Sequence, residues 1–345
     1  MNLTLVDQIA KAVLYEGYLL YPYRPSSVKN QQRFNFGVLY PQAYSEAQDS
    51  LEPCSLQTEC LVVTDAQGDG EPTLELKLRF LHLKRRASSE SSSSPPEGWQ
   101  EAVEQEVNVP RSPLKTLCNK PLRHTFEFSD STEDGSTEDG STEDASTDRS
   151  SAPDAKPRRQ AALDGDIVIA AGNLRDNLFK LRIVVRNTTG LQSVSTRDEA
   201  LMHSLVSAHL VMGVESAEFI SLLEPPEEFH ELAAQCQNVG AWPVLVGDQG
   251  QRDTLLASPI ILYDYPQIAP ESAGDLFDGT EIDEILSLRI LTLTDEEKCE
   301  IRHSDERARH ILERTENMPA EQFMKLHGAL RGLRPVSIPP KEDAS

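Results

Sequence analysis

The sequence predicts an α+β fold, mainly of antiparallel β-strands in a two-layer, sandwich-like arrangement. An N-terminal helix, one inserted helix and a C-terminal helical region complete it. Two observations favour this class. Several segments alternate apolar and polar residues with a period of two, which is typical of half-buried antiparallel strands. Helical patterns lie near the two ends of the chain and once between strands, whereas a parallel wound sheet alternates strands and helices regularly.

The first element expected is an N-terminal helix. Thr4 is a candidate N-cap with Asp7 three residues later, as in a capping box. Gly17 is the natural end of this helix. Five apolar residues follow the helical spacing i, i+3, i+4, i+7, i+8 and predict one buried face: Val6, Ile9, Ala10, Val13 and Leu14.

Strands are expected from residue 34 onward. The clearest alternation lies in 74–80 (LELKLRF) and 179–186 (FKLRIVVR), where every second residue is large and apolar. A Gly-Asp-Gly region before residue 74 predicts a hairpin with the preceding ECLVVT segment. Further strand candidates are 34–40, 124–128, 167–171, 243–247, 260–263 and a strand, favoured over a helix, across 202–214.

The later elements are mostly helical. Residues 226–238 form the inserted helix, since Pro226 suits a first turn and Gly240 an end. In the C-terminal region Thr294 with Glu297 starts a helix near 295–316, with other starts near Thr280 and Pro319.

These elements predict the organisation of the whole chain. It consists of 1–87 for the N-terminal helix and first strands, 88–98 for a flexible loop, 99–129 for further strands, 130–160 for a disordered acidic insertion, 161–268 for the rest of the β domain, 269–335 for the C-terminal helical region and 336–345 for a disordered tail.

A low-complexity segment interrupts the β domain. Residues 130–148 (DSTEDGSTEDGSTEDASTD) repeat a five-residue unit with eight acids and no base. Like charges repel and there is almost nothing apolar to bury, so disorder is expected. A second polar stretch is the loop 88–98. Basic clusters border both stretches: 84–86 precedes the loop, and 156–159 follows the acidic insertion. Their expected role is to balance nearby acids rather than to bind nucleic acid.

Composition excludes several function classes. The net charge is −23, which disfavours binding to nucleic acid or to an anionic membrane. No run of about 18 apolar residues and no signal-peptide pattern is present, so a cytoplasmic protein is expected. The five cysteines form no C-x-x-C pair, which argues against a disulfide framework or a zinc knuckle.

No motif of known chemistry is present: there is no G-x-G-x-x-G, P-loop, G-x-S-x-G or H-E-x-x-H. His203 and His209 have a spacing that keeps their rings apart on either a strand or a helix, and His303 and His310 lie two helical turns apart. Cys236, six residues after His230, is a weak candidate nucleophile. No catalytic, metal-binding or cofactor-binding residue is therefore predicted, and no cofactor.

A tyrosine-rich, mildly cationic stretch at the start of the chain predicts a protein-binding surface. Tyrosine and arginine are typical of binding hot spots. In the alternative interpretation these rings pack the first helix against the sheet. A second stretch around Tyr263 is its acidic counterpart, with twelve acids and three bases between Glu271 and Glu306, and the two stretches are expected to meet within the chain or between subunits. The candidate partner-binding residues are Tyr15, Tyr18, Tyr21, Tyr23, Arg24, Lys29, Arg33, Tyr263, Asp264 and Tyr265.

The stretches LYEGYLLYPYRPSSVKNQQRFNFGVLYP and LASPIILYDYPQIAPESAGDLFDGTEIDEILSLRILTLTDEEK resemble uncharacterised bacterial proteins associated with NiFe-hydrogenase gene neighbourhoods. The resemblance covers the two ends and 177–270, not the low-complexity middle. It implies an accessory role in the assembly or maturation of a metalloenzyme, and it carries no catalytic residue with it.

The expected function is that of a non-catalytic accessory protein whose partner is a metalloenzyme, such as a hydrogenase, or its assembly machinery. One alternative is a hydrolase or metal-dependent enzyme whose site is assembled from scattered residues. The other is a β domain that binds a small ligand. A cleft where several titratable side chains converge would indicate the enzyme, and a sizeable apolar pocket would indicate the ligand-binding domain. The sequence leaves the oligomeric state open.

Overall fold

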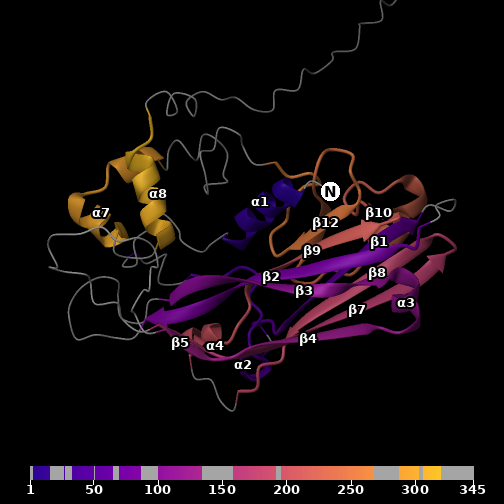
Figure 1. Ribbon diagram of the computed structural model, residues 1–345, viewed down its shortest axis with the longest axis horizontal. Coiled ribbons are helices and arrows are strands. Elements are labelled where there is room, and N and C mark those ends of the chain that lie inside the picture. Colours follow the sequence, from indigo (N-terminus) through magenta and orange to yellow (C-terminus); the bar gives the residue numbers. More distant parts are fainter. Residues whose placement is uncertain are drawn as a thin grey trace, which may run out of the picture.

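The computed structural model describes residues 3–15, 27, 33–49, 51–64, 70–86, 100–133, 158–191, 196–267, 287–302 and 306–319. Two antiparallel sheets pack face to face (Figure 1), which confirms the predicted α+β class. Sheet one has the order β10 (Ala217–Ile220), β1 (Ser55–Thr64), β8 (Leu178–Asn187), β7 (Leu163–Arg175), β4 (Leu122–Phe128).

Sheet two has seven strands. Its order is β11 (Trp242–Leu245), β12 (Thr254–Ser258), β9 (Val206–Glu215), β2 (Thr73–Arg86), β6 (Arg158–Gln160), β5 (Ser131–Glu133). The remaining strand, β3 (Gln100–Pro113), pairs with β2 over almost its whole length. Since β9 and β6 pair with successive parts of β2, both lie along its other edge. The predicted hairpin between ECLVVT and residues 74–80 is wrong, because the first segment belongs to β1 in sheet one and the second to β2 in sheet two.

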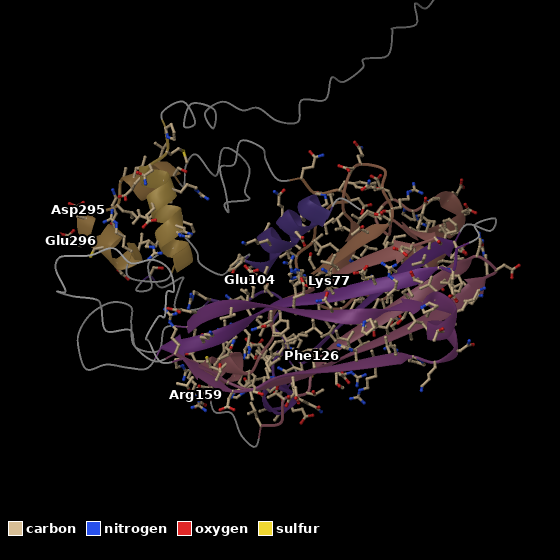
Figure 2. All side chains as sticks on the ribbon, in the orientation of Figure 1. Lys77, Glu104, Phe126, Arg159, Asp295 and Glu296 are labelled. Carbon is tan, nitrogen blue, oxygen red and sulfur yellow. The ribbon has the colours of Figure 1, made fainter. Side chains whose placement is uncertain are left out.

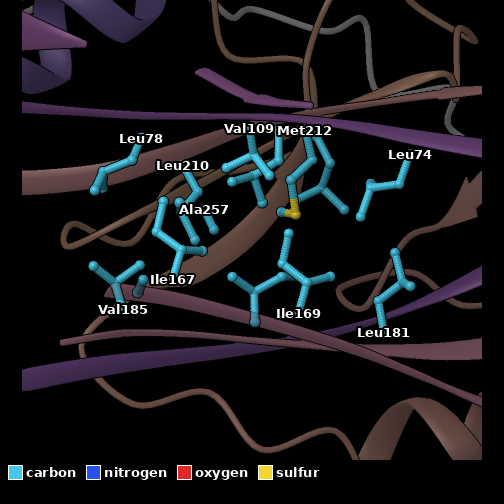
Figure 3. Packing of buried hydrophobic residues seen from close by; sticks show 14 of the residues in the cluster. Leu74, Leu78, Val109, Ile167, Ile169, Leu181, Val185, Leu210, Met212 and Ala257 are labelled. Atoms are coloured by element: carbon cyan, nitrogen blue, oxygen red, sulfur yellow. The ribbon is translucent and has the colours of Figure 1, made fainter. Parts of the chain in front are cut away.

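The main core fills the space between the sheets. The alternation of β2 and β8 places every second side chain inward, as predicted, and those side chains are buried. Figure 3 shows Leu74, Leu210 and Met212 of sheet two facing Ile169 and Leu181 of sheet one. Burial of apolar surface on this scale is the dominant stabilising term of such a sandwich.

Helix α1 (Leu3–Leu14) covers the outer face of sheet two (Figure 1). Its predicted apolar face is confirmed, since Val6, Ile9, Ala10 and Val13 pack against β11, β12 and the residue after β11. On the outer face of sheet one, the short helix α5 (His230–Ala234) and the turn η2 (Glu227–Phe229) cover Leu61 and Leu178.

The inserted helix is shorter than the predicted 226–238. It ends at Ala234 because the residues that follow form hydrogen bonds with polar groups of sheet one instead of continuing the helix. The Gln237 amide donates to the Glu59 carboxylate (2.9 Å), and the Asn238 side-chain oxygen accepts from Thr58 and from the Glu59 amide. These bonds hold the segment extended against β1.

Two predicted strands are wrong. Residues 34–40 form a loop with one bridge at Leu39, because Phe34 and Gly37 both have positive φ, which a strand excludes. Residues 260–263 form no ladder; the prolines at 259 and 266 on either side lack the amide that a ladder needs. The predicted strand across 202–214 begins only at Val206, since Arg197–Met202 is a short helix, α4, capped by Thr196.

The acidic insertion is narrower than predicted. Residues 131–133 and 158–160, assigned to a disordered 130–160 segment, form strands β5 and β6 and pair with each other. Residues 134–157, like the loop 88–98 and the tail 336–345, lie outside the described residues. The short helices α2 (Gln42–Ala47) and α3 (Leu114–Asn119) had no sequence prediction.

The C-terminal region contains α7 (Asp295–Arg302) and α8 (Glu306–Glu316). The predicted capping box is confirmed, because Thr294 and Glu297 exchange backbone-to-side-chain hydrogen bonds of 2.9 and 3.2 Å. The two helices share a small apolar cluster of their own. The predicted helix starts at Thr280 and Pro319 fall at or beyond the limits of the described residues. In the part of the chain that the structure covers, no helix is long and apolar enough to cross a membrane.

Candidate functional site

The predicted partner-binding residues fall into three groups. Tyr18, Tyr21, Tyr23, Arg24 and Lys29 lie outside the described residues. Tyr15 and Arg33 are described and use their polar groups within the chain. Tyr263, Asp264 and Tyr265 lie together on one segment after β12.

Tyr15 connects the end of α1 to sheet two. Its hydroxyl donates to a carboxylate oxygen of Glu104 on β3 (2.7 Å), and Lys11 lies 4.0 Å from the same oxygen. Figure 2 labels Glu104 beside α1. The described part of the tyrosine-rich, cationic stretch at the start of the chain therefore contacts a carboxylate of β3. The acidic 271–306 stretch, its expected counterpart, lies largely outside the described residues.

Arg33 is buried, with 5% of its surface exposed. Its guanidinium donates to the Gln100 carbonyl (2.6 Å) and lies over the Phe34 ring at 4.6 Å. Tyr40 and Tyr44 pack with ring centroids 5.1 Å apart in the cluster that includes Leu14. Burial raises the pKa of Tyr40 to about 12. For these two rings, the alternative of packing within the fold is the correct one.

The remaining candidates define one surface, the Tyr263 segment, residues 258–267. Two of its apolar side chains point outward: Ile261 is 79% exposed and Tyr263 is 86% exposed. Their neighbours Ile260 and Leu262 pack instead against the cluster beneath α1. The segment therefore alternates between an anchored side and an exposed side.

Polar contacts hold this segment to the edge of sheet two. One Asp264 carboxylate oxygen accepts from the Leu245 amide (2.8 Å), and the other accepts from the Ser221 hydroxyl. The Tyr265 amide donates to the Leu245 carbonyl (2.7 Å), and its hydroxyl donates to the Gln251 carbonyl (2.9 Å). Asp264 and Tyr265 thus position the segment, while Tyr263 is presented by it.

Tyr265 adopts a positive φ of 55°, which is unusual for a bulky residue. Such a conformation costs about 1–3 kcal/mol and persists only where surrounding contacts impose it. Here the contacts to Leu245 and Gln251 impose it. The turn at Tyr265 ends the exposed side of the segment and returns the chain to the sheet.

Two buried carboxylates lie on the outer face of sheet one, and both are paired with cations. Glu59 accepts from Lys180 (3.0 Å) as well as from the Gln237 amide. Asp166, 1% exposed, lies 2.6 Å from a nitrogen of Arg123 and 3.8 Å from one of Arg186. These ion pairs connect neighbouring strands, which accounts for the burial of both acids.

Burial keeps three other side chains, His82, His209 and Cys236, in their uncharged forms. Burial lowers the pKa of His82 and of His209 to about 4 each, and it raises the pKa of Cys236 to about 11. A thiol with so high a pKa is a poor nucleophile at neutral pH, which argues against catalysis by Cys236. Across the described ranges, no three His, Cys, Asp or Glu side chains are grouped to hold a metal ion.

Sequence reasoning found Tyr263 but missed Ile261. In SPIILYDYP the four consecutive residues 260–263 are all large and apolar, so the sequence does not distinguish the exposed Ile261 from the packed Ile260 and Leu262. No protein-family model matches the chain, and no curated protein matches it.

Proposed function

We propose that this protein is a non-catalytic accessory protein that binds a protein partner through the Tyr263 segment. The observation that carries this proposal is the exposure of Ile261 and Tyr263 on a segment held in place by Asp264 and Tyr265. A segment ordered before binding loses little conformational entropy on association, which increases affinity. Tyrosine is also enriched at the energetic centre of interfaces.

The size of this surface sets its role. The ring of Tyr263 buries roughly 150–250 Å² when covered. A specific interface takes about 800 Å² from each partner. The Tyr263 segment is therefore proposed as the centre of an interface that extends onto the neighbouring edge of sheet two, where Trp242 is also exposed.

The proposed partner is a metalloenzyme such as a NiFe-hydrogenase, or its assembly machinery. The sequence resemblance supports this partner, and the cytoplasm is the proposed compartment. Four cysteines in described positions are free thiols: Cys54, Cys60, Cys118 and Cys236. Free thiols are typical of a reducing compartment, which supports that location.

Co-purification from a hydrogenase-producing bacterium that encodes the chain tests this proposal. The tagged protein, the I261S/Y263S double variant and the L51S control would be expressed from the native locus, and the hydrogenase large subunit quantified in each eluate. Leu51 is a matched control because it is 85% exposed and lies before β1. We expect the double variant to retain roughly tenfold less large subunit than the other two. Equal recovery in all three, or no recovery in any, would contradict the proposal.

A further inference from the structure

The fold brings together two basic clusters that are more than seventy residues apart in the sequence. β2 and β6 pair in register at Lys84↔Gln160, Arg85↔Arg159 and Arg86↔Arg158. Arg85 therefore lies directly opposite Arg159 on the neighbouring strand. Figure 2 labels Arg159 at the end of the sheet, near β5.

Like charges placed directly opposite on neighbouring strands destabilise a sheet. Arg158 is compensated, because its guanidinium lies 3.2 Å from a carboxylate oxygen of Glu101. Arg85 and Arg159 have no carboxylate partner among the described residues. The positive charge of this pair is therefore not neutralised by that part of the chain.

Arg85 is only partly engaged. Its Nη2 donates to the Asp198 carbonyl (3.2 Å), whereas its buried Nε has no hydrogen-bond partner within the described ranges. Gln100 donates to the same Asp198 carbonyl, and the buried Arg33 donates to the Gln100 carbonyl. These hydrogen bonds connect Arg33 to Arg85 through Gln100 and the Asp198 carbonyl.

We propose that Arg85, Arg158 and Arg159, the cross-strand arginine site, bind an extended Asp- and Glu-rich segment of a partner protein. Guanidinium groups bind carboxylates in a bidentate geometry, and the strand alternation places these arginines on both faces of the β2–β6 pair. An extended acidic peptide that crosses the ends of β2 and β6 can contact the arginines on both faces of this strand pair. A single small anion can contact the arginines of only one face.

This inference rests on the proposed function, because it names the chemistry of a second contact with the partner. A competing occupant exists within the chain. Residues 134–148, between β5 and β6, carry six acids and no base. A tethered acidic segment competes at high effective concentration, so the experiment includes a variant without it.

The test measures the fluorescence anisotropy of a labelled ten-residue peptide of alternating Glu and Asp, titrated with the full chain at low salt. The variants are R85Q/R159Q and the control R175Q/R252Q, which removes two exposed arginines that lie elsewhere and changes the net charge equally. We expect the wild-type chain and the control to bind alike, and R85Q/R159Q to bind roughly tenfold or more weakly. R159Q alone, at an exposed position, gives the same direction of change if the double variant does not fold.

Four results would overturn the proposal. The first is the absence of binding to the wild-type chain, and the second is equal weakening by both double variants. The third is binding that arises only after deletion of 134–148, since the chain's own acids then occupy the site. Stronger binding of a ten-nucleotide single-stranded DNA than of the peptide would also contradict it. The I261S/Y263S variant retains peptide binding, which separates this test from that of the proposed function.

Discussion

Asn187 shows how a single buried side chain connects distant parts of this fold. Its amide nitrogen donates to the carbonyls of Leu39 (2.9 Å) and His203 (2.7 Å), and its oxygen accepts from the Thr189 amide (3.0 Å). One residue at the end of β8 thus holds the segment before α2, the end of α4 and the turn after β8. Sequence patterns carry no sign of this role, because an Asn beside a strand is equally typical of an exposed turn.

We expect Asn187→Ala to lower the free energy of unfolding by about 2–4 kcal/mol, since three hydrogen bonds are lost and buried carbonyls are left unpaired. Urea unfolding at pH 7 measures this change. Asn173→Ala, at an exposed position near the end of β7, is the control and should change stability little. A loss below 0.5 kcal/mol for Asn187→Ala would show that these bonds do not stabilise the fold.

The buried histidines make stability depend on pH. His209 lies fully buried beneath α1, and burial together with the nearby charge of Arg79 lowers its pKa from 6.5 to about 4. Between these values the unfolded chain binds a proton that the folded chain does not. The free energy of unfolding therefore falls as the pH drops from 7 to 4 and levels off below 4, by about 2–3 kcal/mol per buried histidine at pH 4.5.

The His209→Gln variant tests this dependence. We expect its loss of stability between pH 7 and pH 4.5 to be smaller than that of the wild-type chain by about 2–3 kcal/mol, because one titrating group is removed. His230→Gln, at an exposed position, should leave the pH dependence unchanged. Urea titrations of the three chains at the two pH values give one difference in stability for each chain, and identical pH profiles for wild type and His209→Gln would refute the assignment.

At the scale of elements, the sequence predicts helices and strands correctly where the apolar periodicity is strong. It does not predict where a local backbone conformation or a distant contact interrupts an element. The alternation in β2 and β8 and the apolar face of α1 predicted their burial correctly. Residues 34–40 have a strand-like composition, but positive φ at Phe34 turns them into a loop. The helix at 226–238 is shortened by Glu59 and Thr58, which are distant in sequence, so no local pattern contains the information.

The capping box of α7 offers a test at this scale. We expect Thr294→Ala to weaken α7 by about 1 kcal/mol, since the cap of the Glu297 amide is lost. Hydrogen exchange should speed up for amides in Asp295–Arg302, whereas those of β2 and β8 should not change, because α7 and α8 have their own apolar cluster. Faster exchange in β2 or β8 would contradict this independence.

At the scale of the whole molecule, pairing between distant segments creates the features that sequence reasoning could not reach. The sequence identified both basic clusters and assigned them to charge balance. Their register on β2 and β6 depends on the arrangement of sheet two, which no local pattern encodes. The position of Tyr263 on an exposed segment was predicted in part. The roles of Asp264 and Tyr265 in holding that segment depend on Leu245 and Ser221, which come from other strands and loops.

Deletion of residues 134–148 tests how the insertion relates to the fold. We expect the thermal midpoint to stay within about 2 °C of the wild-type value, since the nine residues 149–157 still connect β5 to β6 and loop length has a weak effect on stability. Differential scanning calorimetry measures the midpoint. A large drop would show that the acidic repeat contributes to the folded core.

The most direct test of the central claim is a hydrogen-exchange footprint of the full chain with and without a purified NiFe-hydrogenase large-subunit precursor. We expect protection of the amides in 258–267 and along the adjacent edge of sheet two at β11, and we expect I261S/Y263S to lose this protection. Protection confined to other surfaces, or no protection at concentrations that saturate co-purification, would contradict the assignment of the Tyr263 segment as the partner-binding surface.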